Sequence, residues 1–139
     1  MRVAIVGSGP SGFYAASRIL HSFDAQCGTG ENGVDIHMYE RLPTPFGLVR
    51  YGVAPDHPEV RNVENKFDEV ARDPRFTFLG NVQVTGGADV LPSAAVPIPL
   101  SCMAPYYTHI LFAYGASDAR HLHLPGTGPD GLQHIHTCL

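Results

Sequence analysis

The feature that most constrains this chain is a glycine-rich turn near its N-terminus, in which Gly7, Gly9 and Gly12 have the spacing Gly-x-Gly-x-x-Gly. An apolar, β-prone run at residues 2–6 precedes the turn, and residues 13–22 follow it with apolar positions at helical spacing. In such a turn the first glycine allows a tight bend, the second lets backbone approach a phosphate, and the third lets helix and strand pack closely. The pattern predicts a strand, a turn and a helix whose N-terminus holds a pyrophosphate.

An acidic residue ends the next predicted strand. Residues 34–40 alternate between apolar and polar side chains and finish at Glu40, where a carboxylate can accept both hydroxyls of a ribose. Glu40 lies 28 residues beyond Gly12 instead of the usual ~20, and the polar, glycine-rich segment 27–33 accounts for the excess. A solvated glutamate is the alternative reading of Glu40. The unit predicts an α/β fold with a Rossmann-like open parallel sheet of the FAD/NAD(P)-binding type.

The turn does not by itself identify the ligand. No Gly-Lys-Ser/Thr follows it, so a P-loop nucleotide hydrolase is not supported, whereas FAD and NAD fit equally well. We take it as the chain's one dinucleotide-binding turn.

The remainder of the chain is predicted to form loops of defined shape between shorter helices and strands. Residues 41–58 carry four prolines and two glycines, which predicts a rigid loop without regular structure. A helix is expected from about Pro58 to Asp73, followed by one or two strands within 76–85 and a buried strand within 108–115. The apolar stripe of that helix is Val60, Val63, Phe67 and Val70. No regular secondary structure is predicted for residues 86–105.

Length, charge and cysteine content exclude several classes of protein. A chain of 139 residues allows one domain, and a net charge of −4 does not indicate a nucleic-acid partner. We find no transmembrane stretch and expect no signal or transit peptide before the first strand. Three widely spaced cysteines fit a reducing compartment better than a disulfide framework. The alternating histidines at 121 and 123 and at 134 and 136 lack a Cys-x-x-Cys anchor, so no metal site is predicted.

A longer stretch resembles a known family. Residues 42–65, beginning Leu-Pro-Thr-Pro-Phe-Gly-Leu-Val-Arg-Tyr-Gly-Val-Ala-Pro-Asp-His-Pro, are similar to the characteristic segment of the adrenodoxin reductases, also called mitochondrial-type ferredoxin-NADP reductases. Residues 7–16, 73–84 and 114–116 resemble the same family in the same order. The resemblance implies an FAD enzyme that oxidises NADPH and passes electrons to an iron-sulfur ferredoxin of the adrenodoxin type. It also implies a mitochondrial location, with possible peripheral association with the inner membrane.

The resemblance assigns roles to particular residues. It implies that Ser11 and its neighbouring glycines meet the FAD pyrophosphate, that Glu40 meets the adenosine ribose, and that Leu48 lies on the flavin side. Val84 would meet the adenine through its backbone, and His57 would lie near the flavin and the nicotinamide as the catalytic candidate. A solvated loop histidine is the alternative for His57. Arg50 is equally consistent with a phosphate partner and with a solvated side chain.

The chain also departs from the family. It contains no tryptophan, whereas the family has a late Gly-Trp segment that covers the flavin, and residues 86–105 do not resemble the family. We therefore expect residues 1–139 to form a truncated, incomplete FAD-binding domain with an irregular insert at 86–105, without the NADPH-binding domain and without activity alone. Two rival readings stay open. One is a non-catalytic flavin-binding fragment, and the other is part of another two-nucleotide flavoprotein such as a relative of the glutamate synthase small subunit.

Overall fold

The computed structural model describes residues 1–27, 33–52, 63–86 and 94–116. In chain order the elements are β1 (Arg2–Val6), α1 (Pro10–Cys27), β2 (Asp35–Tyr39), α2 (Leu48–Tyr51), α4 (Val63–Ala71), β3 (Phe76–Leu79), β4 (Val82–Thr85), β5 (Val96–Pro99), α5 (Leu100–Met103), the 3₁₀ turn η1 (Ala104–Tyr106) and β6 (His109–Phe112).

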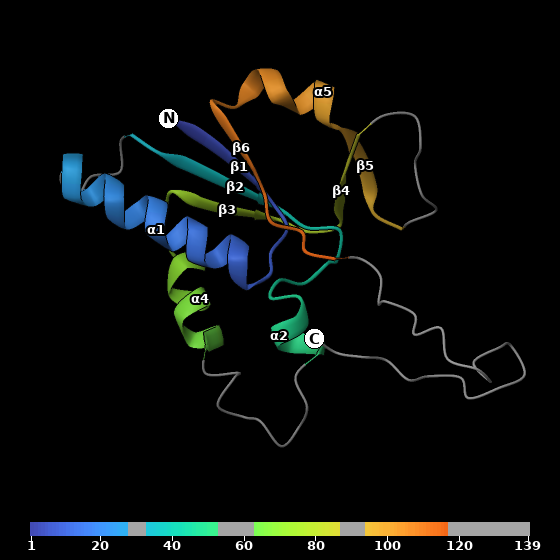
Figure 1. The fold of residues 1–139 in the computed structure, drawn as a ribbon, viewed down its shortest axis with the longest axis horizontal. Helices are drawn as coiled ribbons and strands as arrows, with labels where there is room; N and C mark the ends of the chain where they lie inside the picture. Colours follow the sequence, from blue (N-terminus) through green and yellow to red (C-terminus); the bar gives the residue numbers. More distant parts are fainter. Residues whose placement is uncertain (28–32, 53–62, 87–93, 117–139) are drawn as a thin grey trace, which may run out of the picture.

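Strands β1, β2, β3 and β6 form a central parallel sheet that is covered by a layer on each face, whereas β4 and β5 form a separate two-stranded sheet (Figure 1). Its order is β3-β2-β1-β6, and all three strand pairs are parallel, with Ile5 opposite Met38 on one side and Leu111 on the other. Helices α1 and α4 cover one face, while β4, β5 and α5 lie on the other. The chain leaves β1 for β2 on one side and reaches β6 on the other, so the strand order reverses at β1. This arrangement confirms the expected open parallel α/β sheet.

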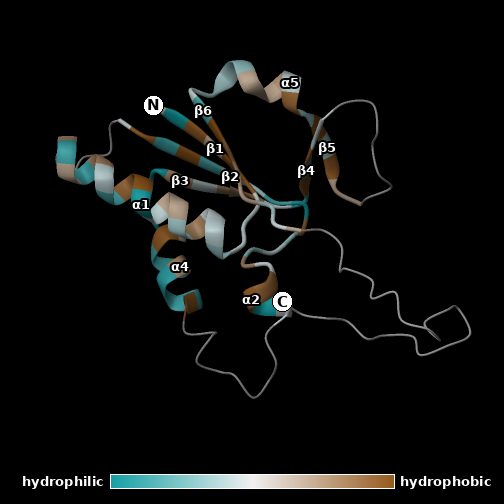
Figure 2. Ribbon diagram, viewed as in Figure 1, coloured by the Kyte–Doolittle hydropathy of each residue, from teal (hydrophilic) through white to brown (hydrophobic). Residues whose placement is uncertain are grey.

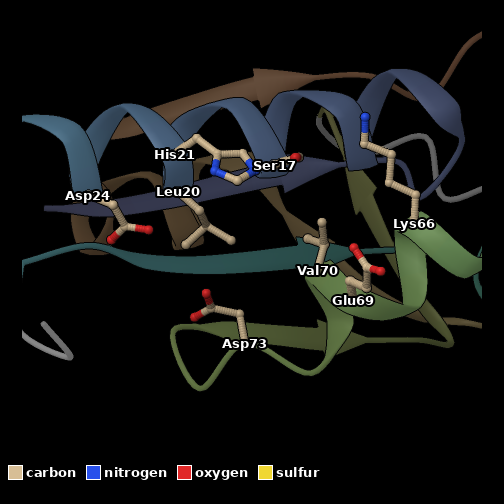
Figure 3. A pocket seen from close by; sticks show the side chains of 8 residues that line it. All are labelled: Ser17, Leu20, His21, Asp24, Lys66, Glu69, Val70 and Asp73. Atoms are coloured by element: carbon tan, nitrogen blue, oxygen red, sulfur yellow. The ribbon is translucent and has the colours of Figure 1, made fainter. Parts of the chain in front are cut away.

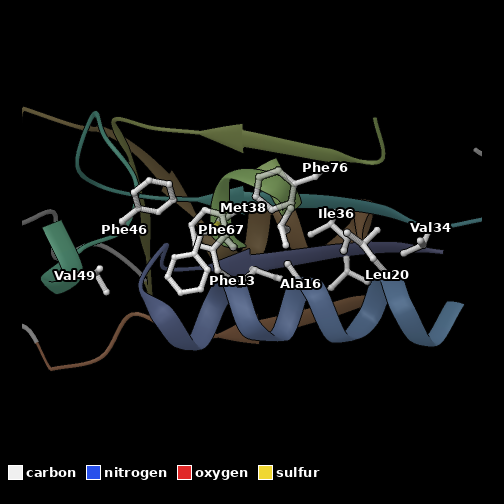
Figure 4. Close-up of a cluster of buried hydrophobic side chains, with 13 residues drawn as sticks. Phe13, Ala16, Leu20, Val34, Ile36, Met38, Phe46, Val49, Phe67 and Phe76 are labelled. Carbon is white, nitrogen blue, oxygen red and sulfur yellow. The ribbon is translucent and has the colours of Figure 1, made fainter. Parts of the chain in front are cut away.

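The larger core lies between the sheet and α1. Phe13 of α1 stacks on Phe67 of α4 with ring centroids 4.9 Å apart, and it also contacts the rings of Phe46 and Phe76 at 5.1 and 5.7 Å (Figure 4). Phe13 and Phe67 are almost completely buried. Each buried aromatic side chain contributes about 1.5 to 3 kcal/mol relative to exposure. The cluster therefore ties α1, α4 and the loop after β2 to one face of the sheet.

Several predicted elements are confirmed at close to their expected bounds. Strands β1 and β2 match the first two predicted strands, and the segment 76–85 forms two strands separated at Gly80 and Asn81. Phe67 and Val70 form the buried face of α4, with Val63 packed against them. Residues 58–62, where the start of that helix was predicted, lie outside the described residues.

Three predictions about local structure are wrong. Helix α1 begins at Pro10, earlier than predicted, because Gly9 accepts the first helical hydrogen bond from Phe13 and proline suits the first helical position; the helix also runs on to Cys27. Residues 48–51 form the short helix α2 inside the predicted loop. Regular structure also occurs within 86–105, where β5 pairs in parallel with β4 and α5 follows directly.

The prediction that β6 is a buried strand is also wrong. Phe112 is 52% exposed and Leu111 is 38% exposed, although both are apolar. β6 lies at the end of the sheet order, so within the described residues it has a strand neighbour on one side only. Figure 2 shows the hydrophobic colouring of β6 continuing along this outer strand. An apolar run identifies the strand but does not show whether anything covers it.

An arginine and two aspartates join α1 to the turn after α4. Arg75 donates to Asp24 at 2.6 Å and to Asp73 at 2.8 Å, and its side chain is 10% exposed. Asp24 and Asp73 also line a pocket of about 160 Å³ between the two helices, together with His21, Lys66 and Glu69 (Figure 3). The hydrogen bonds from Arg75 hold the pKa of both aspartates below the usual value of about 4.

We expect this ion cluster to make stability pH-dependent in acid. Because the folded-state pKa values of Asp24 and Asp73 are lowered, their stabilisation is complete above about pH 4 and is lost as the pH falls through the lowered values. Arg75→Gln should therefore reduce stability at pH 7 and flatten the acid limb of the stability profile. Urea unfolding between pH 7 and 2 measures this. The exposed Arg72→Gln variant is the control, and an acid limb of unchanged steepness in Arg75→Gln would contradict the assignment.

Candidate functional site

The glycine turn is closed by contacts that leave no room for side chains at its ends. Gly7 has φ +108°, and a Cβ there would lie 2.5 Å from the Ala113 carbonyl oxygen. A Cβ on Gly12 would lie 2.3 Å from the Gly7 carbonyl oxygen and 3.3 Å from Cε of Met38. The first glycine therefore lets β6 approach the turn, and the third lets α1 pack against the end of β1.

The middle glycine faces open space. A Cβ on Gly9 would have nothing within 4 Å apart from its chain neighbours. Ser11 is exposed in the first turn of α1, where backbone N–H groups have no acceptor within the helix. The positive end of an 18-residue helix thus faces an open space that accommodates a phosphate. The residues present fit a pyrophosphate at this position.

Glu40 follows β2 directly and is bound to the glycine turn. Its Oε2 accepts hydrogen bonds from the backbone N–H of Ser8 at 2.9 Å and from the Ser8 hydroxyl at 2.7 Å. Its Oε1 accepts from the backbone N–H of Leu42 at 3.1 Å. Ser8 is completely buried, which makes the contact a fixed part of the fold. Sequence reasoning assigned no role to Ser8, because the middle positions of the motif are written as any residue.

The loop after β2 packs against the same turn. Phe46 has φ +85°, uncommon for a residue with a side chain, and its N–H donates to the Ser8 carbonyl at 3.0 Å. A Cβ on Gly47 would lie 3.6 Å from Cα of Gly9. Leu48, at the start of α2, is 73% exposed beside this contact, and the Arg50 guanidinium lies over the Phe46 ring at 5.2 Å. The buried Phe46 ring therefore anchors α2 next to the turn.

A pocket of about 340 Å³ opens at the carboxyl end of the sheet. It gathers three predicted site residues that lie far apart in the sequence: Gly7 follows β1, Glu40 follows β2 and Val84 lies within β4. The other lining residues are Val6, Tyr39, Arg41, Val82, Gln83, Tyr114 and Ala116. The pocket lies where the strand order reverses, which is the usual place for a ligand in an open α/β sheet.

A hydrogen-bonded chain supports the pocket from the second face of the sheet. The Tyr107 hydroxyl contacts Nδ1 of His37 at 2.7 Å and the hydroxyl of Tyr39, a pocket residue. Burial lowers the pKa of His37, and burial together with the Tyr39 hydrogen bond raises the pKa of Tyr107. Both groups are therefore held in their neutral forms near pH 7, and they fix the end of β2.

Other sequence predictions lie outside the described residues. They include His57 with its neighbours and the four histidines of residues 121–136. The Gly-x-Gly-x-x-Gly spacing also recurs at Gly126, Gly128 and Gly131, so the first turn is not the only match to the pattern in the sequence. Across the described residues no group of three or more histidine, cysteine, aspartate or glutamate side chains is placed to hold a metal. No helix in those ranges is long and apolar enough to cross a membrane.

These features define the class of the protein. A parallel β-α-β unit with a glycine turn at a long helix, an acid at the end of the second strand and a pocket at the strand reversal form a Rossmann-like domain of the FAD/NAD(P)-binding type.

The chain is a relative of the NADPH-dependent ferredoxin and adrenodoxin reductases, as the sequence resemblance indicated. It is 45% identical over 124 residues to the NADPH-ferredoxin reductase FprA of Mycobacterium leprae, covering 89% of this chain and 24% of that protein. It is 46% identical over 131 residues to the mitochondrial NADPH:adrenodoxin oxidoreductase of Homo sapiens, covering 94% of this chain and 23% of the relative.

A solved structure agrees with these relatives. The structure of Mycobacterium tuberculosis FprA in complex with NADPH is 42% identical to the chain and superposes with a TM-score of 0.71. The match covers 90% of this chain and 25% of FprA. No family model matches. The chain spans about a quarter of the length of the relatives that it matches.

Proposed function

We propose that this chain forms the FAD-binding part of an NADPH-dependent reductase that passes electrons to an adrenodoxin- or ferredoxin-type iron-sulfur protein. The observation that carries the proposal is that Gly7, Glu40 and Val84 line one and the same pocket at the carboxyl end of the sheet. The names of the relatives, which are NADPH-ferredoxin and NADPH:adrenodoxin reductases, give the direction of electron flow.

Each part of the site has a binding role in this proposal. The open space at Gly9 and the first turn of α1, with Ser11, hold the pyrophosphate. Glu40 accepts hydrogen bonds from the ribose hydroxyls through the lone pairs that Ser8 and Leu42 leave free. Gly7 and Gly12 supply the close packing that keeps these groups together.

The chemistry belongs to FAD, which when bound accepts a hydride from NADPH and releases electrons one at a time. The protein binds and orients the two nucleotides. Leu48 would line the flavin side, since α2 is anchored against the glycine turn by Phe46. His57 remains the proposed catalytic residue near the flavin and the nicotinamide.

We further propose a mitochondrial location for this protein, with possible peripheral association with the inner membrane. The fission yeast and human relatives are named as mitochondrial, whereas the mycobacterial relatives are bacterial. Support for the mitochondrial setting is the resemblance of residues 42–65 to the mitochondrial-type reductases.

Titration of the purified chain with FAD tests the proposal, with Glu40→Ala as the informative variant. We expect saturable binding by the parent chain, followed by quenching of flavin fluorescence. Glu40→Ala should weaken binding by about 1 to 3 kcal/mol, the range for hydrogen bonds to a charged group. The variant should also melt earlier, because the buried Ser8 hydroxyl loses its partner.

Ser8→Ala is the matched control for this titration. It removes the hydroxyl that contacts Glu40 but leaves the carboxylate available to a ribose. We expect its melting temperature to fall while its FAD affinity changes by less than about threefold, equivalent to about 0.7 kcal/mol. A parent chain that does not bind FAD would overturn the proposed function. Equal loss of affinity in both variants would show that Glu40 acts only by supporting the turn.

A further inference from the structure

We propose that His37, Tyr107 and Tyr39 form a pH-sensitive latch, which holds the layer of β4, β5, α5 and η1 on the sheet at neutral pH and loosens it in mild acid. The three side chains form one hydrogen-bonded row, in which Tyr107, directly after η1, joins two residues of β2. We call this row the His37 latch, and we call β4, β5, α5 and η1 the second layer. The inference does not depend on which nucleotide the glycine turn binds.

The second layer is held on the sheet by a small apolar core (Figure 1). Among the described residues, the cluster beneath α1 and α4 contains thirteen buried side chains, whereas the cluster on the opposite face contains only Ala4, Tyr39 and Met103. A segment with few buried apolar contacts opens locally at a smaller cost in free energy. The hydrogen bonds of the latch therefore contribute a larger share of the attachment here than they would beneath α1.

The distance between Tyr107 and His37 indicates the direction of the hydrogen bonds. The Tyr107 hydroxyl has one proton, so it donates to one neighbour and accepts from the other. Its oxygen lies 2.7 Å from Nδ1 of His37, which is at the short limit for an N–H donor and usual for an O–H donor. Tyr107 thus donates to His37, and Tyr39 donates to Tyr107. In this arrangement Nδ1 carries no proton, and both hydroxyl protons have an acceptor.

A proton on Nδ1 of His37 reverses the whole row. A charged imidazole can only donate at Nδ1, so Tyr107 must accept from His37 and donate to Tyr39 instead. The hydroxyl proton of Tyr39 then has no acceptor among the described residues, and Tyr39 is only 8% exposed. A buried donor without an acceptor is destabilising. Protonation therefore favours separation of the second layer from the sheet.

The charged groups that face His37 do not cancel this effect. Arg2 of β1 and Asp35 of β2 act on His37 in opposite directions and are paired with each other at 3.6 Å. Burial, which is the largest influence, lowers the pKa of His37 below its usual value of about 6.5. Because the folded-state pKa is lowered, the stabilisation is complete above about pH 6.5 and is lost as the pH falls from there through the lowered value. The ion cluster of Arg75 does not contribute in this range, since its stabilisation is complete above about pH 4.

Hydrogen exchange of the full chain at pH 7.5 and pH 5.0, corrected for the intrinsic exchange rates, tests the latch. In the parent we expect the protection of residues 96–107 to be lower than that of α1 at both pH values, because the second layer opens before the rest of the chain. Protection of residues 96–107 should fall about fivefold between pH 7.5 and pH 5.0, the change that corresponds to the loss of about one hydrogen bond.

Two variants separate the charge of His37 from its hydrogen bond. In His37→Gln the amide oxygen can still accept from Tyr107 but cannot be protonated, so protection of residues 96–107 should no longer depend on pH. Tyr107→Phe keeps the ring and removes both hydrogen bonds, so protection should be about fivefold or more below the parent already at pH 7.5. His21→Gln and His109→Gln are the controls, because both histidines are exposed and neither belongs to the latch, and both should keep the pH dependence of the parent.

Nitrogen NMR of the imidazole in the parent chain gives a readout that a merely structural role would not move. At pH 7.5 the proton of His37 should lie on Nε2, with Nδ1 unprotonated. A proton on Nδ1 at pH 7.5 would overturn the latch, as would equal protection of residues 96–107 and α1. The same conclusion would follow if His37→Gln kept the pH dependence, or if His21→Gln or His109→Gln abolished it.

Discussion

The Gly9→Val variant is expected to fold like the parent and to lose FAD. No atom lies within 4 Å of the position that a Cβ would take, so the side chain enters open space. That space is where the pyrophosphate must approach the backbone at the start of α1. Blocking the approach removes charge-assisted hydrogen bonds worth about 1.5 to 3 kcal/mol each, so the loss should be about 3 kcal/mol or more, over 100-fold in affinity.

Two measurements on matched proteins separate binding from folding. Gly86→Val is the control, because Gly86 also has open space at its Cβ and does not line the pocket. Thermal unfolding followed by circular dichroism should give similar melting temperatures for both variants and the parent. FAD titration should show binding by Gly86→Val and none by Gly9→Val. Undiminished FAD affinity in Gly9→Val would mean that the phosphate does not lie at this turn.

The Gly12→Ala variant is expected to have a much less stable fold than the parent. Its Cβ would lie 2.3 Å from the Gly7 carbonyl oxygen, and that oxygen belongs to backbone that is itself packed against Ala113. Overpacking against side chains costs about 1 to 3 kcal/mol of stability. A clash with backbone, which moves less easily, should cost about 3 kcal/mol or more. The gain of about 1 kcal/mol from replacing glycine by alanine in a helix does not compensate.

Urea unfolding of Gly12→Ala and Gly9→Ala compares the stability cost of a methyl group at two positions of the same turn. Both changes add a single methyl group, but only the first adds it between packed elements. We expect Gly12→Ala to lose about 3 kcal/mol of unfolding free energy, or to be insoluble, and Gly9→Ala to change by less than about 1 kcal/mol. A stable Gly12→Ala protein would show that α1 can move away from β1 without disturbing the sheet.

The first β-α-β unit could be predicted from sequence because its signals are local. The apolar run before Gly7, the helical spacing after it and the alternation leading to Glu40 each lie within one element. The fold class follows from these patterns, since parallel strands joined by a helix have few other arrangements. The order of elements in this part of the chain needed no knowledge of distant contacts.

The unpredicted features depend on contacts between distant segments. Pro97 and Pro99 obscure β5, which exists because Val84 and Ile98 pair across the two-stranded sheet. The exposure of β6 depends on its place at the end of the sheet and not on its composition. For the site, the pattern located Glu40 but could not show that Ser8, 32 residues away, holds its carboxylate. Likewise, Tyr114 lines the pocket only because β6 lies beside β1.

The hydrogen bonds between Ser8 and Glu40 have a consequence for the entropy of binding. A free glutamate side chain must give up rotamer freedom when it binds a ligand, at a cost of up to about 2 kcal/mol. Here that freedom is already lost on folding, because the backbone N–H groups of Ser8 and Leu42 hold the carboxylate, and these two bonds do not depend on the Ser8 hydroxyl. The acid therefore meets a nucleotide in a preorganised geometry, and more of the interaction free energy remains available as affinity.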